Sequence, residues 1–438
     1  YPQAVPRLSV SHTPVRRRSG PDHKPKNPTE AMAAGQRDTR KTRLKARARA
    51  LLITEIGGLE RLFRRTPKKS PDRPQLIRRL AEGYVELEAA AVRDKTEAEI
   101  KAMDNKKKNP SLASKARADA SQAKKIVDAA RKKAIAYYTL MKNAYPNYSK
   151  IEEVLYYLAY EHEQAGDLTN ARKVYYELIQ KAPKSPYIPN AYLAFGELFF
   201  VEAQGDPSKW DLAAAAYREV VKYPPPDNKV YGYARYKLAY VHWNKEEHPE
   251  AMNEFKKVVE FGDQYTQLPG AAQLSKSARR DMIPVYAAAG SPDRAYNFFK
   301  PISADKGGEQ TKTINMLNEL GLAYLDTGHY KEGIVLYKDL LNRDKGSRDC
   351  FYQSQITVAV QAMKSGDKDG IKKELESQLA MRNEFVKGSA PSDKKLECSN
   401  KTAELLSETA MAWHLEAVGS GGVRGTGDKK RMDLSTFL

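Results

Sequence analysis

The chain has 438 residues, 41% of them hydrophobic, and its 74 Lys and Arg against 55 Asp and Glu give a formal net charge of +19 at pH 7. Its two cysteines are too few for an iron–sulfur cluster or a structural zinc site. No apolar stretch approaches the length of a membrane-spanning helix, so none is expected. The length allows a large core, which one continuous solenoid can hold as well as several globular domains.

Residues 1–40 are rich in Pro, Ser, Arg and Gly and have almost no apolar periodicity, which predicts a basic, disordered arm. Basic residues in and just after this arm could contact an anionic membrane or an acidic partner. This basic anchor comprises Arg16, Arg17, Arg18, Lys41, Arg43, Lys45, Arg47 and Arg49. Specific binding of nucleic acid is not expected, because no zinc-finger, homeodomain or RNA-recognition pattern is present.

Residues 41–73 are predicted to form an N-terminal capping helix followed by a proline-rich linker. Apolar residues recur there at helical spacing, at Leu52, Ile56, Leu59 and Phe63. Residues 74–150 are predicted to form a helical hairpin, with a first helix around Ala81 and a second around Ala134. An insert rich in Lys, of about 41 residues, separates the two halves. We expect this insert to be an extended, solvated helical hairpin.

A spacing of about 34 residues recurs between residues 151 and 380. The first helix of each unit carries a pair of small or apolar residues: Leu158-Ala159, Phe195-Gly196, Leu238-Ala239, Met282-Ile283 and Leu320-Gly321. The second helix carries a small residue and, four positions later, an aromatic one: Ala171 and Tyr175, Ala213 and Tyr217, Ala251 and Phe255, Ala295 and Phe299, Gly333 and Tyr337. Each hairpin leaves one apolar face bare, so only stacking completes the core. Pro284 falls inside a predicted first helix, where proline disfavours regular geometry.

These units resemble the tetratricopeptide repeat. Residues 312–346 match it most closely, with Leu317, Leu320-Gly321, Tyr324, Gly328 and Tyr337 at the signature positions. The fold expected is an all-α, right-handed superhelical solenoid of six to seven helical hairpins. Solenoids of this kind mostly bind other proteins.

Aromatic side chains flank the packing face of the first helices. The set comprises Tyr156, Tyr160, Phe200, Tyr233, Tyr236, Tyr240 and Trp243. In tetratricopeptide proteins these places line the concave groove, so the resemblance implies a peptide-binding groove here. Tyrosines in a solenoid can instead pack sideways against the next repeat, and this alternative stays open. Binding of a chaperone C-terminus is not expected, because aromatics occupy the places where that function needs basic and asparagine residues.

Residues 381–418 are predicted to form a linker and a C-terminal capping helix, and residues 419–438 a glycine-rich flexible tail. The apolar face expected for the capping helix consists of Ala403, Leu406, Ala410 and Trp413. Cys350 and Cys398 could form a disulfide in an oxidising envelope and would be inert thiols in a reducing cytosol.

The stretches at residues 70–88 and 151–184 also resemble envelope-associated tetratricopeptide proteins of bacteria, in particular the adventurous gliding motility group of myxobacteria. This resemblance implies a non-catalytic scaffold that binds other proteins of an envelope complex, in the periplasm or at the outer membrane. A cytoplasmic location stays open. Alternatives are an outer-membrane assembly or cell-division accessory and, in another class, a nucleic-acid-associated adaptor that uses the basic arm. No cofactor, metal ion or catalytic residue is expected, because the histidines are scattered and no nucleophile motif is present.

Overall fold

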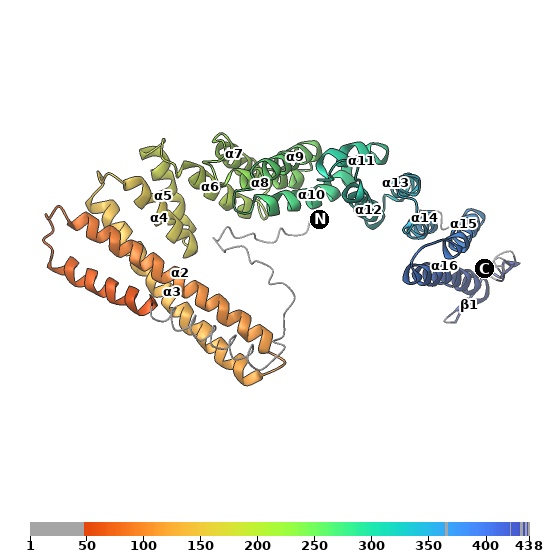
Figure 1. Ribbon diagram of the computed structural model, residues 1–438, viewed down its shortest axis with the longest axis horizontal. Helices are drawn as coiled ribbons and strands as arrows, with labels where there is room; N and C mark the ends of the chain where they lie inside the picture. Colours follow the sequence, from red (N-terminus) through yellow and green to blue (C-terminus); the bar gives the residue numbers. More distant parts are fainter. Residues whose placement is uncertain (1–47, 364–366, 421, 430–431, 434–435, 437–438) are drawn as a thin grey trace. The chain divides into compact units, whose positions relative to one another are not determined.

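The computed structural model describes residues 48–363, 367–420, 422–429, 432–433 and 436. These residues are almost entirely helical, which confirms the predicted all-α fold (Figure 1). The chain divides into two compact units, residues 1–234 and residues 235–438. The predicted arm, residues 1–40, lies outside the described residues.

Residues 48–65 form the helix expected at the start of the N-terminal unit. It packs on α2 (Arg73–Asn105) and α3 (Pro110–Ala144). Ile56 is buried in this contact, and Leu52, Leu59 and Phe63 lie around it. The helical spacing of these apolar residues therefore marks the face that covers the hairpin.

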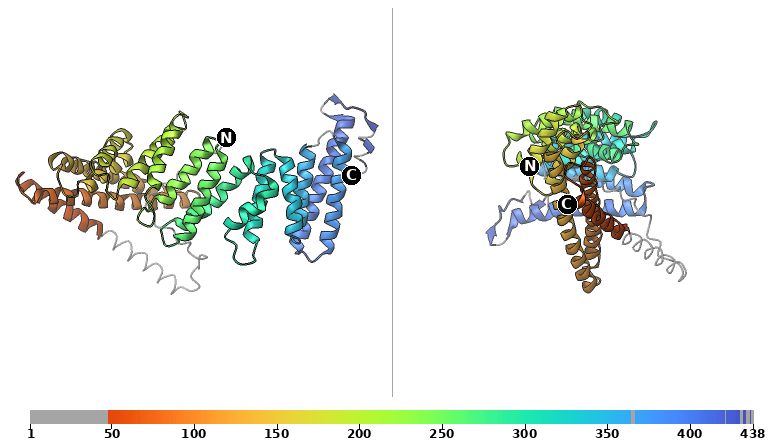
Figure 2. Two further views of the ribbon diagram at one scale, coloured as in Figure 1. Left: turned by 90° about the horizontal axis from the view of Figure 1, so that it is seen from above. Right: turned by 90° about the vertical axis from the view of Figure 1, so that its left-hand side faces the viewer.

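The helices α2 and α3 pair along their length as one long antiparallel hairpin (Figure 2). Alanines fill most of the seam: Ala91, Ala102, Ala113, Ala116, Ala120, Ala123 and Ala130 are all buried. Their small side chains allow the two backbones to approach closely. Asn109 caps α3, because its side chain accepts a hydrogen bond from the backbone N–H of Leu112 at 3.1 Å.

Two further hairpins complete the N-terminal unit. The first pairs α4 (Ile151–Gln164) with α5 (Leu168–Lys181), and the second pairs α6 (Ile188–Glu202) with α7 (Lys209–Val221). Gly166, at φ +77°, forms the turn between α4 and α5, and Asp167 caps α5. The helix α8 (Tyr231–Asn244) contains the boundary between the two units.

The C-terminal unit continues with α9 (His248–Gln264), α10 (Ala271–Ala289), α11 (Pro292–Phe299), the 3₁₀-helix η1 (Lys300–Ile302), α12 (Thr311–Asp326), α13 (Tyr330–Arg343), α14 (Asp349–Met363), α15 (Lys368–Lys387) and α16 (Ser392–Val418). Most of these helices pack on a neighbour in the chain, but α10 packs on α9 and α12, and α11 packs on α12 and α13. Pro284 does not end its helix, since α10 runs on to Ala289. The small and aromatic residues predicted at the helix crossings are all buried, which confirms the repeat register.

The C-terminal segment differs from the prediction in two ways. The buried face of α16 consists of Cys398, Thr402, Leu405, Trp413 and Ala417, whereas Ala403 is exposed, so the predicted face was largely one position out of register. Residues expected to be a flexible tail form a small antiparallel hairpin of β1 (Gly419–Ser420) and β2 (Val423–Arg424). Backbone N–H groups of Thr426 and Gly427 bond to carbonyls at the end of α16, which holds this segment in place.

Candidate peptide-binding surface

Two of the aromatic residues expected in the groove are core residues instead. On α8, Tyr236 is 2% exposed and Tyr240 is 7% exposed. Both hydroxyls donate to the Asp281 carboxylate on α10, that of Tyr240 at 2.9 Å, and both rings lie against Phe255. Burial raises the pKa of both phenols. The expected exposure is therefore wrong for these two residues, because α10 supplies a buried acceptor that holds them inward.

Phe200 is also buried, at 6% exposure, with Trp210 of α7 edge-on at 5.0 Å between ring centroids. It fills space inside its own hairpin and does not line an open surface. The expectation of exposure is wrong here too, because α7 covers this flank of α6.

The other four aromatics, Tyr156, Tyr160, Tyr233 and Trp243, are half-buried. The ring of Tyr156 stacks on Tyr187 with centroids 4.5 Å apart, and its hydroxyl accepts a hydrogen bond from Asn190 at 3.4 Å. These partners lie at the start of the next hairpin. Tyr156 therefore joins two neighbouring hairpins and leaves only part of its ring for a ligand.

A small acidic cleft of about 330 Å³ lies between α10 and α12. Its lining residues are Arg280, Asp281, Ile283, Pro284, Glu319, Leu322, Ala323 and Asp326. Asp281 already accepts the two tyrosine hydroxyls and pairs with Arg280 at 2.8 Å. The other two carboxylates that line the cleft, those of Glu319 and Asp326, are exposed.

The larger cleft, about 960 Å³, lies between α12, α14, α15 and α16, and we call it the disulfide cleft. Its lining residues are Asn318, Ser347, Arg348, Cys350, Phe351, Ser354, Gln355, Phe385, Asp393, Lys394, Leu396, Glu397, Cys398, Asn400, Lys401 and Glu404. Leu396 is 61% exposed, although it is a large apolar residue. The rim carries the ion pairs Lys394–Glu397 and Lys401–Glu404, each at 2.7 Å. Sequence reasoning missed this cleft, because its residues come from four helices.

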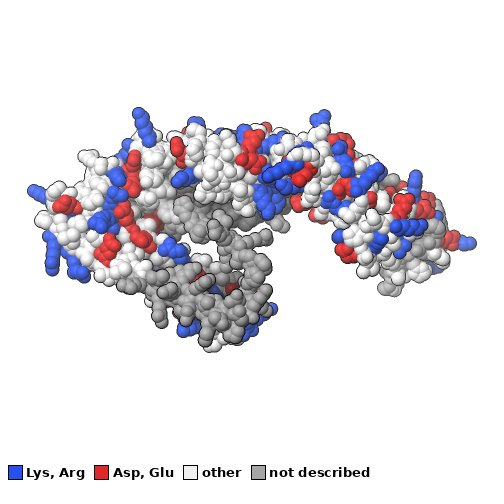
Figure 3. Space-filling model, viewed as in Figure 1, with Lys and Arg blue, Asp and Glu red and all other residues white. Residues whose placement is uncertain are grey.

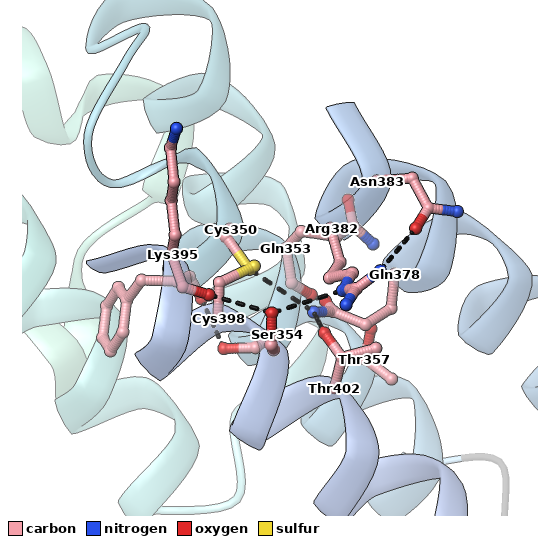
Figure 4. The surroundings of a disulfide bond; sticks show 12 residues. Cys350, Gln353, Ser354, Thr357, Gln378, Arg382, Asn383, Lys395, Cys398 and Thr402 are labelled. Carbon is pink, nitrogen blue, oxygen red and sulfur yellow. Dashed lines mark hydrogen bonds between the residues drawn. A yellow bond between two sulfur atoms is a disulfide. The ribbon is translucent and has the colours of Figure 1, made fainter. Parts of the chain in front are cut away.

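The disulfide between Cys350 and Cys398 forms part of the lining and joins α14 to α16 (Figure 4). The two Cα atoms are 5.8 Å apart. Gln378 of α15 lies beside the bond and donates to Thr402 at 2.8 Å. Three of the four helices around the cleft, α14, α15 and α16, are therefore tied by a covalent bond and a buried hydrogen bond.

Two sequence models described as tetratricopeptide repeat match the chain, at residues 153–185 and 203–266. These two stretches of the chain are therefore similar to tetratricopeptide repeats. None of the curated proteins compared with the chain matches it significantly. The similar solved structures include a tetratricopeptide repeat protein from Parabacteroides merdae ATCC 43184, with 12% identity, a TM-score of 0.32, and coverage of 71% of this chain and 99% of that one.

The first tetratricopeptide match covers α4 and α5, and the second covers α7, α8 and α9. Tetratricopeptide repeats indicate a protein-interaction scaffold with protein partners, and such repeats are typically non-catalytic. On the face that Figure 3 shows, Lys and Arg are interspersed with Asp and Glu over the repeats. Because charges of both signs alternate there, we expect this face to attract a charged partner only weakly.

The predicted basic anchor lies almost wholly outside the part of the chain that the structure describes. Its last member, Arg49, is described and forms an ion pair with Asp94 of α2. Among the described residues, none of the helices combines the length and apolar character that crossing a bilayer needs. In the same described part of the chain, no group of three His, Cys, Asp or Glu side chains could hold a metal ion.

Proposed function

We propose that the chain is a non-catalytic scaffold that binds a peptide segment of a protein partner in the disulfide cleft. The observation that carries the proposal is the cleft itself, whose volume is that of a ligand site. It combines an apolar lining, including Phe351 and the exposed Leu396, with a charged rim of both signs. This is the arrangement of a protein interface, in which apolar anchors lie at the centre and polar groups surround them.

The cleft replaces the aromatic groove as the first site to test, because Tyr236 and Tyr240 are buried against Asp281. Replacing those tyrosines would damage the core and would say little about a ligand. Leu396, in contrast, is exposed, so a change there should leave the fold intact.

Selection of displayed peptides on the purified chain, followed by fluorescence anisotropy, tests this site. We expect Leu396→Asp to weaken a selected peptide about tenfold, since it places a charge against the apolar face of the ligand. The matched control is Leu415→Asp, which changes another exposed leucine of α16 that does not line the cleft. Equal affinity of the selected peptides for both variants and for the unchanged chain would refute the site.

We further propose that the scaffold works in the bacterial envelope, as part of a gliding machinery. The disulfide supports an oxidising compartment, because such bonds rarely persist in a reducing cytosol. The resemblance of residues 70–88 and 151–184 to envelope-associated proteins of the gliding group supports the finer assignment. Acid-quenched source cells should yield Cys350 and Cys398 protected from alkylation until reduction, and free thiols would argue against this compartment.

Deletion of the gene distinguishes a role in motility from a role in outer-membrane assembly or cell division. Loss of single-cell gliding with normal growth and normal outer-membrane protein levels is the expected result. A defect in outer-membrane assembly or in division, with gliding intact, would contradict the motility assignment and favour an accessory role.

A further inference from the structure

The closed end of the α2–α3 hairpin carries a concentrated positive charge that neither the repeats nor the disulfide cleft uses. We call it the basic tip, and it consists of Lys101, Met103, Lys106, Lys107, Lys108 and Lys115. Residues 101–117 contain six Lys and Arg and a single Asp. All six residues of the tip are exposed, and Met103 is 75% exposed.

The lysines of the tip have no role in the packing of the hairpin. Ala102, Ala113 and Ala116 form the seam at this end, and alanine packing needs no charge on the outer faces. No carboxylate in the described part of the chain pairs with Lys106, Lys107 or Lys108. Three neighbouring unpaired lysines repel one another, so the fold gains nothing from their proximity.

The length of the hairpin also places the tip far from α4 and α5 (Figure 2). Ala134 of α3 lies in the core shared with α4 and α5, and Pro110 starts α3 at the tip. At about 1.5 Å per residue, the intervening helix spans roughly 36 Å. The tip can therefore touch a flat surface without steric interference from α4 and α5.

The basic anchor, which precedes the hairpin in sequence, ends at Arg49, near the same end of the hairpin. Arg49, at the start of the described chain, pairs with Asp94 of α2. Asp94 precedes Asn105, the end of α2, by eleven residues, which corresponds to about 17 Å along the helix. The structure thus brings the attachment point of the basic arm toward a tip that lies more than 50 positions away in sequence.

We propose that the basic tip docks on a membrane surface that contains anionic phospholipid. Several lysines attract such a surface together, and Met103 can enter the boundary of the acyl chains between them. Residues 85–136 contain no aromatic side chain, whereas single-stranded nucleic acid is held by aromatic stacking. An acidic protein partner would need a larger apolar contact than one methionine offers.

Co-sedimentation of the full chain with vesicles tests the proposal. We expect binding to vesicles of phosphatidylcholine and phosphatidylglycerol, no binding to phosphatidylcholine alone, and weaker binding at higher salt. Changing Lys106, Lys107 and Lys108 together to Gln should weaken binding on the order of 100-fold, at about fivefold per lysine. Met103→Gln should weaken it several-fold without any change of charge.

The matched control changes Lys331, Lys338 and Lys345 together to Gln, which removes the same charge from exposed positions in and just after α13 and should leave vesicle binding unchanged. Circular dichroism and thermal unfolding of each variant check that the fold is retained. The proposal is overturned if the tip variant binds vesicles as tightly as the unchanged chain. It is also overturned if a DNA or RNA oligonucleotide binds more tightly than the vesicles and the tip variant loses that binding.

Discussion

Tyrosine hydroxyls, most of them on buried side chains, donate to carboxylates in both units. The pairs are Tyr84–Glu60 at 2.8 Å, Tyr175–Glu163 at 3.0 Å, Tyr217–Glu197 at 2.6 Å, Tyr240–Asp281 at 2.9 Å and Tyr352–Asp344 at 2.7 Å. A hydrogen bond to a charged acceptor is stronger than one between neutral groups. These tyrosines therefore stabilise the fold, and they are not simply a surface for binding a ligand.

The Asp281 carboxylate accepts from two tyrosines, Tyr236 and Tyr240, and both of them are buried. We expect Asp281→Leu to lower the free energy of unfolding by about 2–4 kcal/mol, because two buried hydroxyls lose their acceptor. Urea unfolding followed by circular dichroism measures this. Asp326→Leu, in the same cleft but exposed, should change the free energy by less than about 0.5 kcal/mol. If Asp281→Leu and Asp326→Leu changed the free energy of unfolding equally, Asp281 would not stabilise the core as the acceptor of the two hydroxyls.

A buried acidic pair lies where α2, α3 and α4 meet. Arg131 donates to Glu88 at 2.6 and 3.0 Å, and its Nε lies 3.9 Å from a carboxylate oxygen of Glu161. Burial is the main cause that raises the pKa of Glu161 above 4.5, followed by its hydrogen bond to Glu88 and the charge of that group. One arginine cannot neutralise two buried carboxylates, and this favours the protonated form of Glu161.

This proton makes stability depend on pH. The folded chain holds it above pH 4.5, where the unfolded chain has released it. The stabilisation is complete below pH 4.5 and is lost as the pH rises through the raised pKa of Glu161. We expect the urea midpoint of the unchanged chain to fall over this range more steeply than that of Glu161→Gln, whose amide cannot titrate. Parallel pH profiles for the two proteins would show that Glu161 is not the titrating group.

At the scale of the element, two helix pairs approach so closely that only glycine fits. A Cβ on Gly196 would lie 2.4 Å from the Tyr217 ring, and one on Gly321 would lie 2.5 Å from the Tyr337 ring. Both glycines belong to first helices, and both tyrosines belong to the second helices that cross them. The repeat therefore matches a small residue on one helix with a large ring on the other.

Alanine at these positions should destabilise the protein, although alanine normally favours a helix over glycine. We expect Gly196→Ala to lower the free energy of unfolding by about 1–3 kcal/mol through overpacking. Gly57→Ala, in the helix at residues 48–65, has space for the added methyl and should be neutral or raise stability by up to about 1 kcal/mol. Thermal unfolding of both variants shows whether each change lowers or raises the stability of the protein. A stabilised Gly196→Ala protein would mean that the two helices can separate at little cost.

At the scale of the whole molecule, stability in a stacked array depends on each hairpin and its neighbours. The disulfide closes a loop between α14 and α16 at a sequence separation of 48, inside the C-terminal unit. In the chain-entropy model such a loop contributes about 4 kcal/mol. This contribution should be local, because α2 to α7 belong to the other unit.

Hydrogen exchange measured by mass spectrometry tests this locality. Reduction of the disulfide should lower the protection of α14, α15 and α16 and leave that of α2 to α5 unchanged. A variant with both cysteines changed to Ser should not respond to the reductant. Loss of protection throughout the chain would show that the two units unfold as one cooperative body.

The sequence alone determined the helical hairpins, their register and the segregation of charge. Helix periodicity and crossing residues such as Ala171 and Tyr175 depend on neighbours within one hairpin, so the local pattern was sufficient. The same reasoning failed for Tyr236 and Tyr240, whose acceptor Asp281 lies more than 40 positions away on another hairpin. Whether a residue beside the packing face is covered depends on which helix stacks over it.

Only the tertiary structure decided which surfaces stay open. The disulfide cleft collects residues from four helices, and no single helix pattern contains it. The ion pair between Arg49 and Asp94 likewise joins segments 45 positions apart, near a tip that the sequence presents only as a lysine-rich insert. The physical reason is that periodicity defines the faces of one helix, whereas a cleft or a shared charged end arises from the spacing and direction of several helices.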